Sequence, residues 1–391
     1  MRFVTKFYVV ALLATCTLTY FAYELINRQS YPVPAPAAEI ATDQGQEGKA
    51  TTFSSPPNSE GNDKPQDDKA QSPPEKSATN EFKNRLVVFG DSSSDDSIFP
   101  GPSTGKVWNN LLCSKYECTR ESYSQGSDSS IAVVDSHELE LLGQKNLLPS
   151  EPLPDITAQV DTFMTREKDR AAGLTDGAIA ERRQNTIFVV QFGLWDVWRL
   201  IGQPENVVQD SINRSIDTIF KQLARIVDEY TPTDVKIILM GAIDVTFLPA
   251  YTAANGDRQA IEVSEHWNAE LRRRTEEFKR ASIFLVDTQS FLVDQFRLRE
   301  LWSNGYIESD EYGREGRVAW LNVRDACLDG TKKKMLFMST STCRSPEKYL
   351  FWDAMHFGPG AQKLLAADIY KDIRPLWLEK KQEDSTAAPS S

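Results

Sequence analysis

The sequence predicts one α/β domain with a mainly parallel sheet and helices on both faces. Between residues 83 and 376, short apolar runs alternate with longer segments of helical periodicity. The apolar runs are continuous rather than alternating, which is typical of strands covered on both faces. Strands that alternate with helices indicate crossover connections, and such connections build a parallel sheet.

Each element is predicted from its own pattern. Four runs rich in β-branched and apolar residues are expected to be strands, at 85–89, 186–192, 235–243 and 282–286. The strongest helical pattern covers 207–230, where large apolar residues recur every three or four positions on one face. A second helix is expected at 257–280, on the surface because it is heavily charged, and a final helix follows Gly358 and Pro359.

The first residues of the chain predict a membrane anchor. Arg2 and Lys6 precede an apolar stretch at 7–26, whose length is close to the ~20 residues that span a bilayer. We therefore expect a short cytoplasmic segment at 1–6, a transmembrane signal anchor at 7–26 and a type II orientation, with the rest of the chain in the lumen or outside the cell. A cleaved signal peptide, which would release a secreted protein, is the alternative.

Residues 27–82 hold few of the large apolar residues that a packed core requires, and 377–391 consist mostly of the polar run EKKQEDSTAAPSS. The first segment is rich in Pro, Ser, Glu and Gln and is predicted to be a disordered stalk, and the second is predicted to be a disordered polar tail. The folded domain is therefore expected at 83–376. The net charge of -12 and the absence of a block rich in Lys and Arg argue against a nucleic-acid partner.

Cysteine usage agrees with a secretory location. Four cysteines can pair in three ways, and we expect the local pairs, Cys113 with Cys118 and Cys327 with Cys343. Disulfides form in oxidising compartments, and a glycosylation sequon at Asn213 fits the same location. The chain has three histidines and neither a CxxC nor an HxxxH pattern, so we expect no metal site.

The stretch RLVVFGDSSSDD, residues 85–96, ends an expected strand in a cluster of serines and carboxylates. Ligands of parallel sheets bind at the carboxyl ends of strands, so Ser92 is a candidate nucleophile. A helix N-cap is the alternative interpretation, because Ser and Asp are good capping residues. Asp353 and His356, three residues apart ahead of the final helix, favour the nucleophile, since a serine needs a base and the base needs an acceptor.

These motifs resemble those of the GDSL-type esterases and lipases of the SGNH hydrolase superfamily. The sequence GDS at 90–92 is similar to the first motif of the family, and DAMH at 353–356 is similar to the last. The run SYSQGSDSS at 122–130 is similar to the region of the second motif, where a glycine N–H contributes to the oxyanion hole. Gly126 is the best match to that glycine. The resemblance covers about residues 83–375 and implies a single flavodoxin-like domain.

The third motif departs from the family. Its pattern is G-x-N-D, and its asparagine donates to the oxyanion, whereas this chain has GLWD at 193–196 with Trp195 in the asparagine position. An indole N–H is a donor with a different reach from a carboxamide, and the loss of one oxyanion donor costs about 10²–10³ in rate. Four outcomes stay open: Trp195 donates, another residue substitutes, the Ser92 and Gly126 N–H groups suffice, or activity is reduced.

The resemblance implies a serine ester hydrolase that forms an acyl-serine intermediate and requires no metal or organic cofactor. Ser92 would be the nucleophile, His356 the base and Asp353 the acid that orients the base. The expected substrates are O-acyl or O-acetyl groups of glycans, or lipid esters. The alternative is a catalytically weakened SGNH domain that binds carbohydrate or lipid in the lumen.

Overall fold

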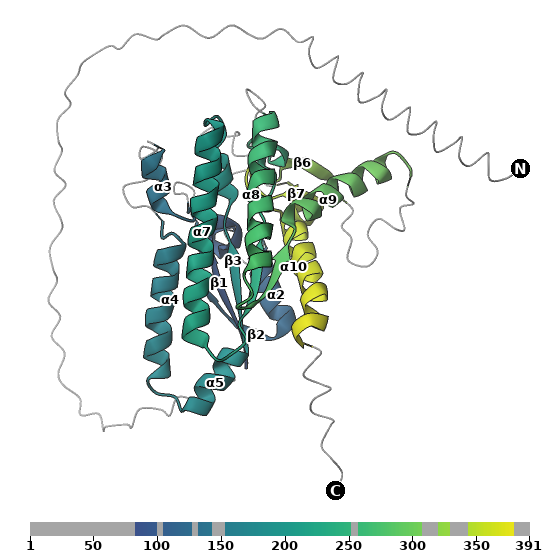
Figure 1. Ribbon diagram of the computed structural model, residues 1–391. Coiled ribbons are helices and arrows are strands. Elements are labelled where there is room, and N and C mark those ends of the chain that lie inside the picture. Colours follow the sequence, from purple (N-terminus) through teal and green to yellow (C-terminus); the bar gives the residue numbers. More distant parts are fainter. Residues whose placement is uncertain are drawn as a thin grey trace, which may run out of the picture. The chain divides into compact units, whose positions relative to one another are not determined.

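A five-stranded parallel sheet forms the centre of the structure, a computed structural model (Figure 1). Its strands are β1 (Asn84–Gly90), β2 (Cys118–Ser122), β3 (Thr186–Gln191), β4 (Lys236–Met240) and β5 (Ser282–Val286). They lie in the order β2-β1-β3-β4-β5, and each neighbouring pair is parallel. This is the flavodoxin-like order, so the predicted fold class is confirmed. The chain reverses its direction of winding between β1 and β3, which is where ligands of such sheets bind.

The structure describes residues 83–99, 105–126, 132–142, 153–251, 257–306, 320–328 and 343–378. By its contacts the chain divides into two units, Met1–Pro74 and Glu75–Ser391, and every described residue belongs to the second. The segments predicted as cytoplasmic, transmembrane and stalk lie outside the described residues. Within the ranges given above, no helix combines the length and the apolar character that a membrane span requires.

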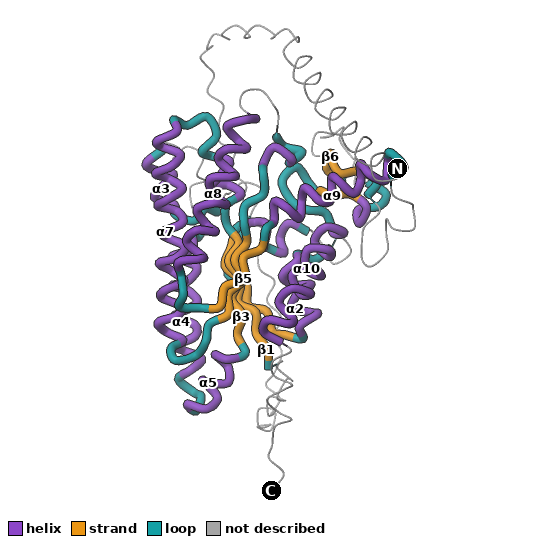
Figure 2. The backbone as a smooth tube through the Cα atoms, turned by 45° about the vertical axis from the view of Figure 1, so that its right-hand side comes forward, coloured by secondary structure: helices purple, strands orange, loops and turns teal. Residues whose placement is uncertain are grey.

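Helices cover both faces of the sheet (Figure 2). On one face lie α4 (Ile156–Ala171), α7 (Glu205–Tyr230) and α8 (Asp257–Glu277), and on the other lie α2 (Trp108–Tyr116) and α10 (Pro359–Ile373). The remaining α-helices of the described chain are shorter or lie towards the ends of the sheet: α3 (Ser136–Leu141), α5 (Asp176–Gln184), α6 (Leu194–Trp198) and α9 (Thr288–Ser303). A small parallel pair, β6 (Asn322–Ala326) and β7 (Tyr349–Phe351), stands beside α9.

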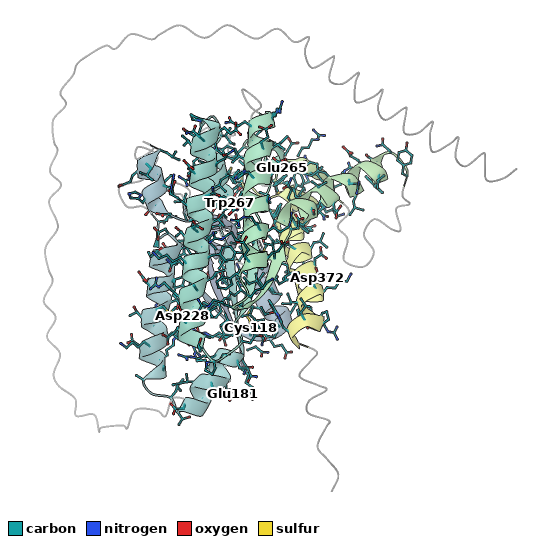
Figure 3. The ribbon with its side chains drawn as sticks, in the orientation of Figure 1. Cys118, Glu181, Asp228, Glu265, Trp267 and Asp372 are labelled. Atoms are coloured by element: carbon teal, nitrogen blue, oxygen red, sulfur yellow. A yellow bond between two sulfur atoms is a disulfide. The ribbon has the colours of Figure 1, made fainter. Side chains whose placement is uncertain are left out.

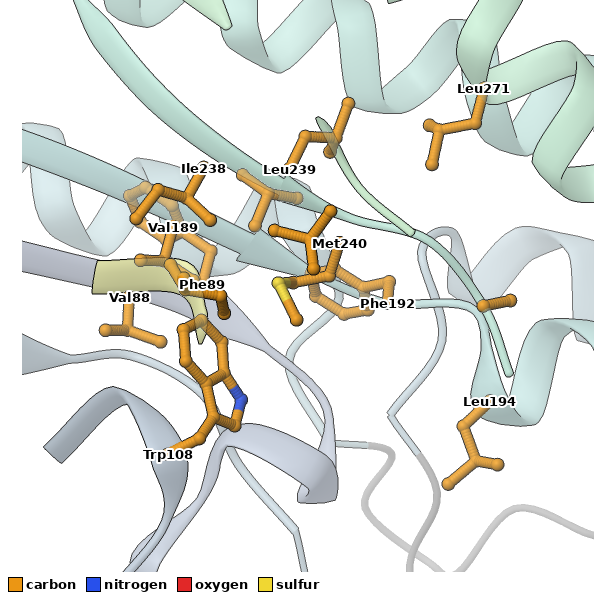
Figure 4. Close-up of a cluster of buried hydrophobic side chains, with 14 of the residues drawn as sticks. Val88, Phe89, Trp108, Val189, Phe192, Leu194, Ile238, Leu239, Met240 and Leu271 are labelled. Carbon is orange, nitrogen blue, oxygen red and sulfur yellow. The ribbon is translucent and has the colours of Figure 1, made fainter. Parts of the chain in front are cut away.

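The predicted patterns match the packing of these elements. Every large apolar residue on the expected face of α7 is buried, from Val208 to Tyr230. Helix α8 lies on the surface, as predicted from its many charged residues. Glu265 is exposed on its outer face, while Trp267 is fully buried on its inner face (Figure 3). The central strands contribute side chains such as Phe89 and Ile238 to one continuous core (Figure 4).

Two structural features were absent from the sequence prediction. Strand β2 has the sequence CTRES and lies at the sheet edge, where its polar side chains are only partly buried. The domain also extends to Leu378 in a short π-helix, Arg374–Leu378. Trp377 is buried, and its Nε1 donates to Ser282 Oγ at 2.8 Å. The predicted tail boundary at 377 was therefore wrong, because this tryptophan packs against the first residue of β5.

Both expected disulfides are present, Cys113–Cys118 and Cys327–Cys343. The first joins the end of α2 to the start of β2, and the second joins the segment after β6 to the one before β7. Disulfides are typical of an oxidising, extracytoplasmic environment. Asn213 is exposed on α7, whereas Ser215 of the same sequon is buried, and its glycosylation stays a prediction.

Candidate active site

The backbone turns sharply where β1 ends and places Ser92 at the carboxyl edge of the sheet. The Asp91 N–H continues the ladder by donating to Gln191 O of β3 at 3.0 Å. Ser92 then begins a single 3₁₀ turn, Ser92–Ser94, and the Asp91 carboxylate caps it by accepting from the Ser93 N–H at 2.8 Å. The N-cap of this turn is thus Asp91. The alternative interpretation of Ser92 as the capping residue was wrong, because Ser92 lies inside the turn.

A glutamine of α4 fixes the end of β1 in place. Gln159 Oε1 accepts from the Gly90 N–H at 2.8 Å, and its Nε2 donates to Gly90 O at 2.9 Å. A Cβ at Gly90 would stand 2.7 Å from Gln191 O, closer than any real contact. The glycine is therefore required for the close approach of the two strands directly before Ser92.

Asp353 and His356 belong to a tight turn between β7 and α10. Asp353 Oδ1 accepts from the N–H groups of Met355 and His356, each at 2.8 Å, and the Trp352 N–H donates to His356 O at 2.8 Å. These bonds close the turn and bring both side chains to the same side. The three-residue spacing seen in the sequence is thus the spacing of a carboxylate-capped turn.

The three expected catalytic side chains meet in one chain of hydrogen bonds. His356 Nε2 lies 2.8 Å from Ser92 Oγ, although 264 residues separate them in sequence. His356 Nδ1 lies 2.9 Å from each carboxylate oxygen of Asp353. This is the arrangement of a serine nucleophile, a base and an acceptor that orients the base.

Electrostatics keep Asp353 in its ionised form. Burial alone raises the pKa of this carboxyl, but hydrogen bonds and charge interaction with His356 outweigh burial, so its pKa lies below the usual value. Backbone N–H groups of Met355 and His356 act in the same direction. The ionised carboxylate can stabilise an imidazolium at His356.

Gly126 lies against Ser92 but does not present a free donor. A Cβ at Gly126 would stand 2.5 Å from Ser92 Cβ, so only a glycine fits beside the serine. Its N–H donates to Asp95 Oδ2 at 2.7 Å. The predicted oxyanion donor is therefore next to the nucleophile, as expected from the second motif, yet it is occupied by a carboxylate.

Trp195 is the second residue of α6, which starts directly after β3. Its Nε1 is buried and has no hydrogen-bond partner, and no hydrogen bond joins it to Ser92 among the described residues. Its ring packs on Trp198 with centroids 6.4 Å apart, and Trp198 packs on Tyr251 at 6.0 Å. The indole N–H of Trp195 is thus a buried donor without an acceptor among the described residues. The rings of Trp195, Trp198 and Tyr251 form a row.

Sequence reasoning missed a small cavity of about 30 Å³ beside His356, lined by apolar residues and a few polar ones. Asp91 and Thr288 both line it, both are 1% exposed, and Asp91 Oδ2 and Thr288 Oγ1 lack hydrogen-bond partners among the described residues. The cavity has room for a water molecule. Burial, aided by the charge of Asp196, raises the pKa of Asp91 to about 6. Only the GDS motif could have pointed to Asp91, and no pattern in the sequence points to Thr288.

The part of the chain that the structure describes holds no group of His, Cys, Asp and Glu side chains arranged as a metal site. The chemistry that the described residues can perform is nucleophilic attack by Ser92 with proton transfer to His356.

Comparisons with known proteins give similarity at the level of solved structures. No protein-family model and no curated protein matches the sequence. Among the solved structures, a protein described as a GDSL-like lipase from Parabacteroides merdae is 9% identical, covers 74% of this chain and 95% of its own, and has a TM-score of 0.35. An acetyl xylan esterase is 11% identical over 74% of this chain and 99% of its own, with a TM-score of 0.36.

A catalytic mutant of an acetylxylan esterase from Geobacillus stearothermophilus is 14% identical, covers 75% of this chain and 95% of its own, and has a TM-score of 0.32. All three proteins are described as lipases or esterases, as is the family that the motifs of this chain resemble. At these identities and scores the similarity assigns no activity. The function must therefore be derived from the geometry around Ser92.

Proposed function

We propose that the chain is a serine ester hydrolase that transfers an acyl group to water through an acyl-serine intermediate. The observation that carries this proposal is the hydrogen-bond chain from Ser92 Oγ through His356 to Asp353. Its 2.8 Å contact is short enough for direct proton transfer between the serine and the imidazole.

The proposed reaction has two halves. His356 Nε2 takes the proton of Ser92 Oγ while that oxygen attacks the ester carbonyl carbon, and Asp353 stabilises the imidazolium. The imidazolium then protonates the departing alcohol oxygen, which leaves an acyl-serine. A water molecule attacks this ester, His356 takes its proton and returns it to Ser92 Oγ, and the acid is released.

The charge that develops on the carbonyl oxygen requires donors. The backbone N–H groups of Ser92 and Gly126 are the proposed donors, with Trp195 Nε1 as a third. Gly126 can contribute once its N–H exchanges the Asp95 carboxylate for the oxyanion. Each donor of this kind is worth about 10²–10³ in rate.

The proposed substrates are O-acyl or O-acetyl groups on glycans, or lipid esters. The two disulfides support a location in the secretory pathway. We further propose that residues 7–26 anchor the chain in the membrane and that 27–82 form a stalk, with the domain in the lumen or outside the cell. A cleaved N-terminal segment would instead release a secreted enzyme.

The test compares the full chain with its Ser92→Ala variant on 4-nitrophenyl acetate and butyrate. We expect the variant to lose at least about 10³ in kcat, since the nucleophile is removed. Labelling of the wild-type serine by a fluorophosphonate probe, located by mass spectrometry, should be absent from the variant. Equal rates for the two proteins would exclude the hydrolase.

A second candidate function is supported by the oxyanion region. Gly126 donates to Asp95, and Trp195 stands where the family has asparagine, so the site has fewer free donors than the motifs imply. A catalytically weakened domain that binds acylated carbohydrate or lipid would have these features. Ligand binding without turnover, in a wild-type chain that the fluorophosphonate does not label, would favour this candidate.

A further inference from the structure

A second, larger cavity of about 600 Å³ lies between the segment that follows β4, helix α9 and strand β6. The segment after β4 connects this cavity to the catalytic turn. Its residues Thr246–Leu248 line the cavity, and two residues further on the Ala250 N–H donates to Ala354 O at 2.9 Å. Ala354 lies between Asp353 and His356. The cavity is therefore joined to the proposed catalytic turn by a direct backbone contact.

Two unpaired cations from different elements line this cavity. Arg297 comes from α9 and Arg324 from β6. Neither guanidinium takes part in an ion pair, a hydrogen bond or an aromatic contact within the described ranges, whereas most of the other arginines there do. Arg258, for example, pairs with Glu262 at 2.7 Å. Two guanidinium groups without a partner among the described residues are unusual in one cavity of a chain whose net charge is -12.

The charge in the cavity favours an anionic ligand. Glu300 also lines the cavity, so its lining contains two positively charged residues and one negatively charged residue. Guanidinium groups bind carboxylates with two parallel hydrogen bonds, and this geometry makes arginine the preferred residue for recognising them. An arginine that has no carboxylate partner among the described residues can offer that geometry to a ligand.

Aromatic side chains form part of the cavity wall, beside the charged and polar ones. Phe247 and Phe296 meet with ring centroids 4.9 Å apart, and Tyr251 adds a ring that also contacts Trp198. Pockets for small ligands combine aromatic surfaces with polar groups that fix the ligand, and 600 Å³ lies within the usual range for them. These walls suit the flat faces of one or two sugar rings.

We propose that this cavity binds a carboxylate-bearing sugar unit of the glycan whose acyl group reacts at Ser92. The inference rests on the proposed function and deepens it: the substrate class becomes an acylated acidic polysaccharide. Arg297 and Arg324 hold the uronate carboxylate, Phe247 and Tyr251 contact the ring, and the backbone contact at Ala250 joins this subsite to the catalytic turn. A long-chain lipid is disfavoured, because charged side chains from α9 and β6 line the cavity.

The test measures binding of trigalacturonic acid to the full chain by isothermal titration calorimetry, with xylotriose as the neutral probe. Neither probe carries an ester, so binding does not depend on hydrolysis. We expect trigalacturonic acid to bind at least about tenfold more tightly than xylotriose, as two charged hydrogen-bond donors imply. The double variant Arg297→Gln/Arg324→Gln should lose this preference.

Arg258→Gln serves as the matched control. It removes one exposed positive charge from α8, at a residue that does not line the cavity, and should leave binding unchanged. Equal affinity for the two probes, no loss of affinity in the double variant, or binding to phosphatidylglycerol vesicles without binding to trigalacturonic acid would each overturn the inference. If the wild-type chain prefers trigalacturonic acid but does not hydrolyse 4-nitrophenyl acetate, only the proposed function is overturned.

Discussion

The backbone N–H of Gly126 donates to the carboxylate of Asp95 at 2.7 Å, directly beside Ser92. Asp95 also caps the next 3₁₀ turn, where its Oδ1 accepts from the Ser97 N–H at 3.1 Å. One carboxylate therefore both closes a turn and occupies the N–H that we propose as an oxyanion donor. Its negative charge would oppose the charge that develops on a substrate carbonyl oxygen.

We predict that Asp95→Asn raises kcat on 4-nitrophenyl acetate by about tenfold, which corresponds to ~1.4 kcal/mol less repulsion in the transition state. The asparagine can still cap the turn through its carbonyl oxygen. Steady-state kinetics on the purified full chain measure the effect. Asp96→Asn is the control, because it removes the same charge from a neighbouring exposed carboxylate that pairs with Arg120. A lower rate in Asp95→Asn would mean that the carboxylate is needed to hold Gly126 in place.

The indole nitrogen of Trp195 is a buried donor without a partner in the part of the chain that the structure describes. We predict that Trp195→Phe lowers kcat at least tenfold while KM changes little, because a donor used only in the transition state contributes about 10²–10³ in rate. Phenylalanine keeps an aromatic ring against Trp198. Trp198→Phe is the control for the aromatic packing alone. An unchanged kcat in Trp195→Phe would assign the oxyanion to backbone donors.

Asp353 orients His356 through Nδ1 and also closes the turn through backbone N–H groups. We predict that Asp353→Asn lowers kcat by about 10³–10⁴, because an amide cannot stabilise the imidazolium and selects the wrong tautomer. The carbonyl oxygen of asparagine can still accept from Met355 and His356, so circular dichroism should be unchanged. A loss smaller than tenfold with an intact fold would contradict the assigned role.

Asp91 makes stability depend on pH. Burial raises its pKa from 3.8 to about 6, so its contribution to stability is full below 3.8 and is lost as the pH rises through about 6. At pH 8 the ionised carboxylate costs roughly 3 kcal/mol of unfolding free energy. We predict that Asp91→Asn is more stable than wild type at pH 8 and equally stable at pH 4, with the amide oxygen retaining the cap on Ser93.

Urea unfolding of the full chain at both pH values measures this difference. Asp169→Asn, at an exposed position on α4, is the control and should change stability at neither pH. Destabilisation of Asp91→Asn at pH 8 would show instead that the ionised carboxylate has a partner in the cavity beside His356.

Local patterns in the sequence were sufficient for the fold class. The strands at 85–89 and 282–286 and the helix at 207–230 each have an apolar pattern that a short window shows, and each is found within two residues of its expected position. Strand β2 could not be predicted in this way, because its polar residues are stabilised by pairing with β1 rather than by their own burial. Likewise the packing of Trp377 could not be predicted, because it depends on a contact with Ser282, which is 95 residues away in sequence.

The sequence by itself pointed to the candidate residues of the site: Ser92 at a strand end, and the Asp353 and His356 pair in one turn. It left three pairings of the four cysteines open, and the structure has the two local ones. The candidate residues follow from residue type and short spacing, which constrain local geometry. Only the tertiary structure decided how distant segments meet, and hence that Asp95 occupies the Gly126 donor. The same holds for the cavity that Arg297 and Arg324 line, because it depends on how helix α9, strand β6 and the segment after β4 pack together.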